Sequence, residues 1–339
     1  MSWDKATIIT PDGKAISAQA PVIVSASRST DIPAFYGDWF VERFKAGYVK
    51  WHNPFNGSPL YVSFKNTRLV VFWTKNPKPF IKHLPFLDEN IRNYYFQFTL
   101  NDYDHEKLER KVPPLKGRIE TFINLSEKIS AERVIWRFDP LFLTDKIGVD
   151  ELLKKIENIG DQLENYTRKL VFSFADIGIY KKVENNLKRN EISYQEFDIL
   201  KMNEFANGLH RLNKRWNFEL ATCSEKIDLA KYGIIHNKCI DDDLIIRLFS
   251  NDSKLMKFLG VEFEEPSLFN GQNQVIIKAM LKDKGQREFC GCINSKDIGQ
   301  YNTCPHDCVY CYANTSIHQV EKNYQHHKLY PNGETIIGK

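Results

Sequence analysis

Short apolar runs alternate with longer amphipathic segments over the first two thirds of the chain, and this alternation restricts the possible folds more than any other feature. Six runs rich in β-branched and aromatic residues predict strands at residues 22–26, 69–73, 94–98, 133–137, 170–174 and 218–221. Between them, apolar residues recur at helical spacing, as at Phe35, Trp39 and Phe40. Strands that alternate with helices in this way predict an α/β protein with a parallel sheet.

We expect this sheet to form a parallel (β/α) barrel, partial or complete, of about six to eight strands. A doubly wound open sheet is the alternative. The Asp12-Gly13 turn signal predicts an N-terminal hairpin, and residues 48–65 would add a second hairpin or a further strand. Because the alternation ends near residue 260, we expect a barrel-like domain over residues 1–260. Residues 261–339 would form a cysteine-rich iron-sulfur segment that packs on the barrel mouth.

Polar and charged residues follow several of the predicted strands. Arg28 and Asp31 come after the first strand, Lys75 comes after the second, and Arg137 and Asp139 close the fourth. The strands of a parallel barrel all point the same way, so these side chains would gather at the rim where barrel enzymes build their active sites. We therefore treat these five as candidate catalytic residues. Two other interpretations stay open: polar loop residues commonly cap helices, and Arg137 with Asp139 would also suit a buried ion pair.

Net charge and hydropathy limit the partners and the compartment that the sequence predicts. The net charge is only +4 and the basic residues are spread along the chain, so a nucleic-acid partner is possible but not indicated. The first twenty residues lack a secretory pattern, and no apolar run reaches the ~20 residues that a membrane span needs. We therefore expect a cytoplasmic protein without membrane contact, in which the seven cysteines are reduced.

Five of the seven cysteines lie between Cys290 and Cys311, and this clustering favours metal binding over disulfides. Cys304, Cys308 and Cys311 are separated by three and then two residues. Three thiolates can hold three irons of a [4Fe-4S] cluster and leave the fourth iron open to a substrate or cofactor. The triad therefore predicts a reactive iron-sulfur site.

This spacing, the aromatic Tyr310 before the third cysteine and the strand-helix pattern together resemble the radical S-adenosylmethionine (SAM) superfamily. The run Cys-Val-Tyr-Cys-Tyr-Ala at residues 308–313 is similar to the version in the branch around spore photoproduct lyase. Over nearly its whole length, the chain resembles an uncharacterised bacterial family called domain of unknown function 1848. The hallmarks of that resemblance are residues 25–33, 72–77, 95–99 and 133–140 and the terminal cysteine block.

The resemblance to radical SAM proteins implies roles for the candidate residues. The triad would hold the cluster, and SAM bound at the open iron would be cleaved reductively to a deoxyadenosyl radical that abstracts hydrogen from a substrate. Tyr310 would contact the adenine of SAM, whereas Arg28 and Arg137 would bind SAM or the substrate. The implied partners are a small-molecule or nucleotide-like substrate and an electron donor such as flavodoxin or ferredoxin.

The position of the triad departs from the superfamily pattern. Its usual members carry the three cysteines in the loop after the first barrel strand, whereas here that loop is Ser27-Arg-Ser-Thr-Asp31 and the triad lies near the C-terminus. The second strand is also not followed by the Gly-Gly-Glu run that commonly binds the methionine amine of SAM. Either the triad folds back over the barrel mouth from the C-terminal end, or the resemblance is convergent.

Four cysteines remain once the triad is set aside: Cys223, Cys239, Cys290 and Cys292. Four thiolates are the number that a second, fully ligated [4Fe-4S] cluster requires. Cys290-Gly-Cys292 would place two ligands close together, and Cys223 ends a predicted strand at the same rim as the triad. The alternative is that Cys223 and Cys239 are ordinary buried or incidental thiols.

Two other functions compete with the radical enzyme. The cysteines, with His306 and His318, would also suit a zinc-binding knot that makes the protein a nucleic-acid or protein binding module. An iron-sulfur electron carrier or sensor would use the same ligands without SAM. An open iron beside a polar barrel mouth favours the enzyme over a carrier.

Overall fold

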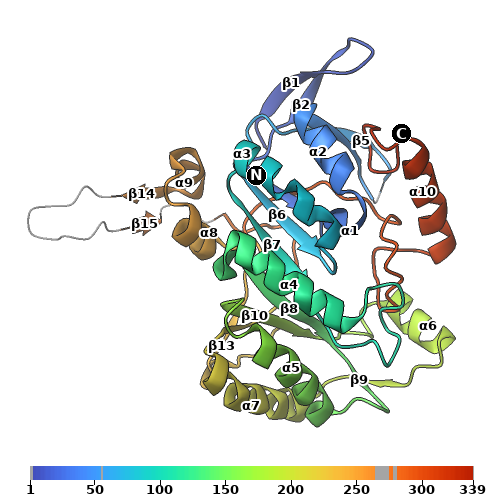
Figure 1. Cartoon of the computed structure of the whole chain (residues 1–339), viewed down its shortest axis with the longest axis vertical. Helices are drawn as coiled ribbons and strands as arrows, with labels where there is room; N and C mark the ends of the chain where they lie inside the picture. The colour runs from blue at the N-terminus through green and yellow to red at the C-terminus, as the bar shows by residue number, and fades with distance from the viewer. Residues whose placement is uncertain (1–2, 55, 264–274, 278–280, 339) are drawn as a thin grey trace, which may run out of the picture.

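The structure is a computed structural model that describes residues 3–54, 56–263, 275–277 and 281–338 (Figure 1). Its centre is an eight-stranded parallel sheet, in which all six predicted strands are present. The strand order is β13-β12-β10-β8-β7-β6-β3-β16. These strands are β3 (Ile23–Ala26), β6 (Leu69–Thr74), β7 (Tyr94–Thr99), β8 (Val134–Leu141), β10 (Lys169–Phe174), β12 (Glu219–Thr222), β13 (Ile234–His236) and β16 (Lys296–Asp297).

Strands that follow one another along the chain also lie side by side in the sheet from β3 to β13. Every neighbouring pair is parallel. The prediction of an α/β protein with a large parallel sheet is therefore confirmed. β13 and β16 were not predicted, and β16 brings the C-terminal part of the chain into the sheet beside the first strand, β3.

Helices connect the parallel strands, as a parallel sheet requires. The longer ones are α2 (Gly37–Lys45), α4 (Leu115–Ile129), α5 (Val149–Leu163), α7 (Ile199–Trp216) and α10 (Ile317–Leu329). The shorter ones are α1 (Ile32–Phe35), α3 (Leu84–Asn90), α6 (Lys181–Arg189), α8 (Asp242–Phe249) and α9 (Ser253–Leu259), with 3-10 turns η1 (Lys78–His83), η2 (Ala131–Arg133) and η3 (Ala230–Tyr232). Among the described residues, no helix is long and apolar enough to cross a membrane.

The central sheet is buried on both faces, because side chains alternate along each strand. Even-numbered residues such as Val70, Phe96 and Trp136 belong to the larger core, to which α2, α4, α5 and α7 contribute. Odd-numbered residues such as Val71 and Ile135 belong to a second core, with side chains from α8 and α9. Nearer the carboxyl ends of the strands, the odd-numbered positions on this face hold polar or partly buried side chains in place of aliphatic ones. These are Trp73, Gln97, Arg137 and Cys223.

Smaller sheets complete the fold. β1 (Lys5–Ile9) pairs with β2 (Ala15–Gln19) on either side of the Asp12-Gly13 turn, and β4 (Tyr48–His52) pairs with β5 (Pro59–Ser63) as a second hairpin. The four strands form one sheet in the order β1-β2-β5-β4. Two short pairs remain: β9 (Leu143–Thr144) with β11 (Tyr194–Gln195), and β14 (Val261–Phe263) with β15 (Val275–Ile277).

Candidate functional site

A cavity of about 730 Å³ lies at the carboxyl ends of the parallel strands. The thirteen residues that the sequence predicted for the iron-sulfur enzyme all line this cavity, whereas His318 of the zinc alternative does not. They are Arg28, Asp31, Lys75, Arg137, Asp139, Tyr310, Cys223, Cys239, Cys290, Cys292, Cys304, Cys308 and Cys311. The structure thus brings together strand ends of the parallel sheet, two cysteines near β12 and β13, and five cysteines from the C-terminal segment.

The loop that carries the cysteine triad is fixed by backbone pairing with residues 108–111. Glu109 and Cys308 form an antiparallel bridge. The amide of Val309 donates to the carbonyl of Leu108 at 2.8 Å, and the amide of Lys111 donates to the carbonyl of His306 at 2.9 Å. These bonds hold the triad over the ends of β6 and β7, although the triad comes from the opposite end of the chain.

Asp31 joins three segments around the triad. One carboxylate oxygen accepts the amide of Ala34 at 3.0 Å and so caps α1. The other oxygen accepts the backbone amide of Lys75 at 2.7 Å and lies 2.8 Å from Nε2 of the buried His306. Because both oxygens are occupied in this way, Asp31 is a positioning residue, and His306 is a second one that the sequence had suggested only as a zinc ligand.

Lys75 belongs to a network of polar side chains next to the triad. Its Nζ lies 2.7 Å from a carboxylate oxygen of Glu109 and 3.0 Å from the hydroxyl of Tyr310. The Tyr310 hydroxyl also donates to Glu109, and the Asn101 amide donates to both. Burial opposes charge on Lys75 and Glu109, but their mutual attraction raises the pKa of Lys75 and lowers that of Glu109. The pair is therefore ionised inside the protein.

The four cysteines outside the triad also line the cavity, and three of them lie close together. Cys223 follows the end of β12, and its sulfur lies 3.6 Å from the sulfur of Cys239 in the loop between β13 and α8. The backbone amides of Cys239 and Ile240 both point at the sulfur of Cys292, at 3.2 and 3.4 Å. All seven cysteines are free thiols in the structure.

Arg137 and Asp139 form an ion pair, as the alternative to a catalytic role predicted. Both side chains also line the cavity. Arg137 also donates to the sulfur of Cys239 at 3.0 Å. The guanidinium groups of Arg137 and Arg28 each lie over the ring of Trp73, at 5.3 and 5.2 Å from its centre. Asp139 additionally accepts a hydrogen bond from Ser173.

Asp297 in β16 is a positioning residue that the sequence did not reveal. Its carboxylate accepts hydrogen bonds from the hydroxyls of Ser25 and Ser27 and from the amide of Arg28, at 2.9, 2.7 and 2.7 Å. These bonds attach the C-terminal segment to the loop after β3. A single aspartate between lysine and isoleucine gives no local signal of such a role.

The chemistry of the donor set fits a sulfur-liganded metal. Burial raises the pKa of the Cys304 thiol to about 12 and also raises the pKa values of Cys308 and Cys311. Such thiols become thiolates only when a bound cation compensates their charge. Soft thiolate ligands select iron-sulfur clusters, zinc or Cu(I).

The distances between the cysteine sulfurs help to distinguish a single metal ion from an iron-sulfur cluster. In the described part of the chain, no three cysteine sulfurs lie within 4.8 Å of one another. Four sulfurs around one zinc ion, each at about 2.3 Å from it, would lie about 3.8 Å apart. The irons of a cluster lie apart from one another, so its cysteine ligands are spread more widely than the ligands of a single ion.

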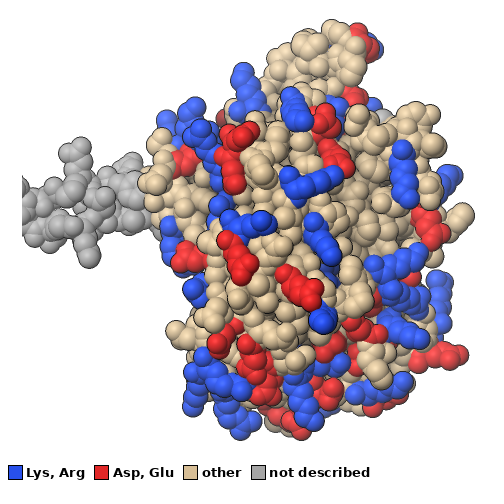
Figure 2. All heavy atoms as spheres, viewed as in Figure 1, with Lys and Arg blue, Asp and Glu red and all other residues tan. Residues whose placement is uncertain are grey.

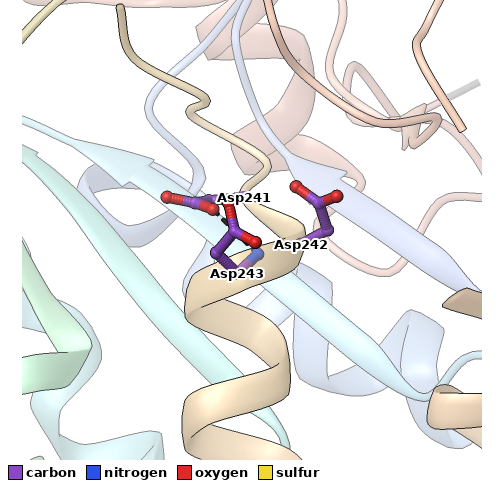
Figure 3. A group of neighbouring side chains, drawn as sticks. All are labelled: Asp241, Asp242 and Asp243. Carbon is purple, nitrogen blue, oxygen red and sulfur yellow. Dashed lines mark hydrogen bonds between the residues drawn. The ribbon is translucent and has the colours of Figure 1, made fainter. Parts of the chain in front are cut away.

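The one group of metal-ligating side chains that does meet the 4.8 Å limit in the described residues is Asp241, Asp242 and Asp243, at the start of α8 (Figure 3). Asp241 caps this helix through the amides of Asp243 and Leu244 and lies 3.1 Å from Nζ of Lys169. Asp242 and Asp243 both pair with Lys238. Helix capping and these two lysines account for the acidic group.

Comparison with known proteins gives one match. A family model described as Domain of unknown function (DUF1848) matches residues 23–313, from β3 through the cysteine triad. Neither the curated proteins nor the solved structures contain a match to this chain.

Proposed function

Because the chain belongs to the DUF1848 family, whose name assigns no activity, we propose a function from its cavity: an iron-sulfur enzyme that uses SAM. Cys304, Cys308 and Cys311 would hold the cluster. When bound, the cluster and SAM would supply a deoxyadenosyl radical for hydrogen abstraction from a substrate. The observation that carries the proposal is that the three thiols of the triad open onto the same cavity as the polar strand ends.

The chain's own residues would bind, orient and exclude water. Cavities of 300–1,000 Å³ commonly hold ligands of drug size, and the volume of about 730 Å³ suits a molecule of the size of SAM. Lys75 contributes a partly buried positive charge whose position is fixed by the buried Glu109. The ring of Tyr310 packs on Phe142, with 5.1 Å between the ring centres, and lines the cavity, where it would form an apolar wall against the adenine.

The sheet is suited to this use if it curves into a partial barrel. The sequential order of strands from β3 to β13 supports such a barrel, because each strand is followed along the chain by its neighbour in space. β16 lies beside β3 and carries the segment that leads to the triad. The carboxyl ends of the strands are the face at which barrel enzymes place their sites.

Charge on the face shown in Figure 2 and the low net charge of +4 favour a small substrate over a nucleic acid. On the face shown in Figure 2, Lys and Arg side chains are interspersed with Asp and Glu and do not form a continuous basic stripe. Nonspecific binding to nucleic acid depends on neutralising several phosphates with a row of cations. We therefore propose a small-molecule or nucleotide-like substrate and an electron donor such as flavodoxin or ferredoxin.

Anaerobic purification followed by iron, acid-labile sulfide and zinc analysis tests the cofactor, and incubation with SAM and a strong reductant tests the chemistry. We expect iron with sulfide and the formation of deoxyadenosine, both reduced in Cys308→Ala. His318→Ala is the matched control, because His318 is exposed, lies close to the triad in sequence and was a ligand in the zinc alternative. Zinc without sulfide would support the binding module, and iron without deoxyadenosine would support an electron carrier; either result overturns the enzyme.

A further inference from the structure

We propose that Cys223, Cys239, Cys290 and Cys292 form a second metal site that binds a fully ligated [4Fe-4S] cluster. The site shares the cavity with the triad but uses different elements: the end of β12, the loop before α8 and the segment before β16. The inference goes beyond the proposed SAM chemistry and does not depend on it. Four protein thiolates would leave no iron open, so this site would be chemically distinct from the triad.

The first argument is the way in which the protein holds the Cys239 loop. The carbonyl of Cys239 accepts hydrogen bonds from the Tyr95 hydroxyl at 2.7 Å and from the Gln97 amide at 2.9 Å. Both donors are buried residues of the central strand β7. The Cys239 loop is thereby attached to the centre of the sheet, with its side chain directed toward Cys223 and the cavity.

The second argument is the number of N–H groups that point at two of the sulfurs. The sulfur of Cys239 accepts hydrogen bonds from the guanidinium of Arg137 and from the side-chain amide of Asn237, each at 3.0 Å. The sulfur of Cys292 accepts from two successive backbone amides, those of Cys239 and Ile240. A thiol is a weak acceptor, whereas hydrogen bonds to an ionised acceptor are about twice as strong as neutral ones. Two donors on each sulfur indicate a pocket built for thiolates.

The third argument is that two buried N–H groups near the cysteines have no acceptor in the described structure. Arg137 pairs with Asp139, but the Nη2 of Arg28 and the indole N–H of Trp73 are buried without a hydrogen-bond partner in the described structure. Arg28 and Arg137 both lie over Trp73, which lines the cavity. Buried donors of this kind require an acceptor. A cluster held by four thiolates is negatively charged and would supply one.

The fourth argument separates a cluster from a single zinc ion. Structural zinc sites are closed, with four ligands around one ion. The sulfurs of Cys223 and Cys239 lie 3.6 Å apart, close to the spacing around one zinc ion, but no third cysteine sulfur of the described chain lies within 4.8 Å of both. All four cysteines also line a cavity of about 730 Å³, which leaves far more room beside the thiols than a single ion fills. This open space favours a cluster that contains several irons, and sulfide analysis separates it from zinc.

Iron analysis of two complementary variants tests the second site. After anaerobic reconstitution, we expect about eight irons per wild-type chain and about four, with matching sulfide, in the C304A/C308A/C311A variant. C239S/C292S should also keep about four. A triad variant that binds no iron, or that binds zinc without sulfide, overturns the proposal. Circular dichroism checks folding; if C239S/C292S unfolds, the triad variant still decides, because it leaves all four proposed ligands in place.

Spectroscopy distinguishes a failure of this site from a failure of the proposed function. In the triad variant, the electron paramagnetic resonance signal of the reduced second cluster should not change when SAM is added. The signal of the cluster left in C239S/C292S should change with SAM, and absence of that change would count against the SAM proposal alone. Arg137→Gln should shift the potential of the second cluster to more negative values, because it removes a cation beside Cys239. An unchanged potential would contradict the proposed location.

Discussion

The carboxylate of Asp31 and the imidazole of His306 meet at 2.8 Å, although they lie 275 positions apart in the sequence. One belongs to the loop after the first strand of the sheet, and the other lies inside the cysteine triad. Both are almost completely buried. The loop after the first strand contains no cysteine. Its contact with His306 holds the C-terminal triad beside that loop.

Asp31→Ala is expected to loosen the triad without unfolding the sheet. The variant loses the α1 cap and the bonds to Lys75 and His306, and loss of a cap alone costs about 1 kcal/mol. We expect a lower iron content after reconstitution and a modest decrease in the free energy of unfolding, measured by urea titration. Asp31→Asn can still cap α1 and should recover part of the stability. Unchanged iron content in Asp31→Ala would show that this contact does not position the triad.

Glu109→Gln should be strongly destabilising. It leaves the partly buried Lys75 without its carboxylate partner, whereas the buried Arg118 keeps Asp104 at 2.9 Å; removal of one partner from a buried ion pair costs about 3–5 kcal/mol. The double variant Lys75→Met/Glu109→Gln removes both charges of the closest pair. Urea titration of the wild type, the two single variants and the double variant gives the coupling energy between Lys75 and Glu109. The double variant should lose about 1–3 kcal/mol less stability than the two single losses added together. Additive effects would mean that the pair is not coupled.

The pH dependence of stability should contain a contribution from Glu225. Burial raises the pKa of this carboxyl from 4.5 to about 8. Between these values the folded chain keeps a proton that the unfolded chain has released, so stability falls as the pH rises from about 4.5 to about 8. Glu225→Gln keeps an acceptor for the amide of Phe174, which lies 2.9 Å away, and cannot ionise.

Thermal melting from pH 5 to pH 8 measures this contribution. The difference in melting temperature between Glu225→Gln and the wild type should grow in favour of the variant as the pH rises. The exposed Glu127→Gln serves as the control and should follow the wild-type profile. Parallel profiles for all three proteins would contradict a raised pKa at Glu225.

Asp297→Ala should detach β16 from β3. The substitution removes the acceptor for Ser25, Ser27 and the amide of Arg28, while leaving the apolar cores intact. Hydrogen exchange followed by mass spectrometry should show faster exchange in residues 23–29 and 296–299, with α5 and α7 unchanged. The exposed Asp145→Ala is the matched control. Equal exchange in both variants would show that the two strands are held by other contacts.

The sequence predicted those parts of the fold that carry a local pattern. The strands β6, β7 and β10 have six residues each and contain apolar or aromatic runs long enough to be recognised. β13 has three residues and β16 has two, so neither contains a detectable period. Their pairing depends on contacts between distant segments, which a local pattern does not record.

The same distinction applies to the candidate site. The cysteines and the polar strand ends were recognisable because their residue type or position carries chemical meaning. Glu109 was missed, since it lies in the connection between β7 and α4 without a motif around it. The role of His306 as a partner of Asp31 was also hidden, because a histidine between cysteines is read first as a metal ligand.

The pairing of β16 with β3 also sets an order of events during protein synthesis. A ribosome makes every other strand of the central sheet before Asp297 and the triad leave its exit tunnel. Until then, the nascent chain presents only Cys223, Cys239, Cys290 and Cys292 of the seven thiols, and Glu109 has no Cys308 to pair with. In the proposed enzyme, the triad could therefore receive its cluster only after the other strands of the central sheet have been made.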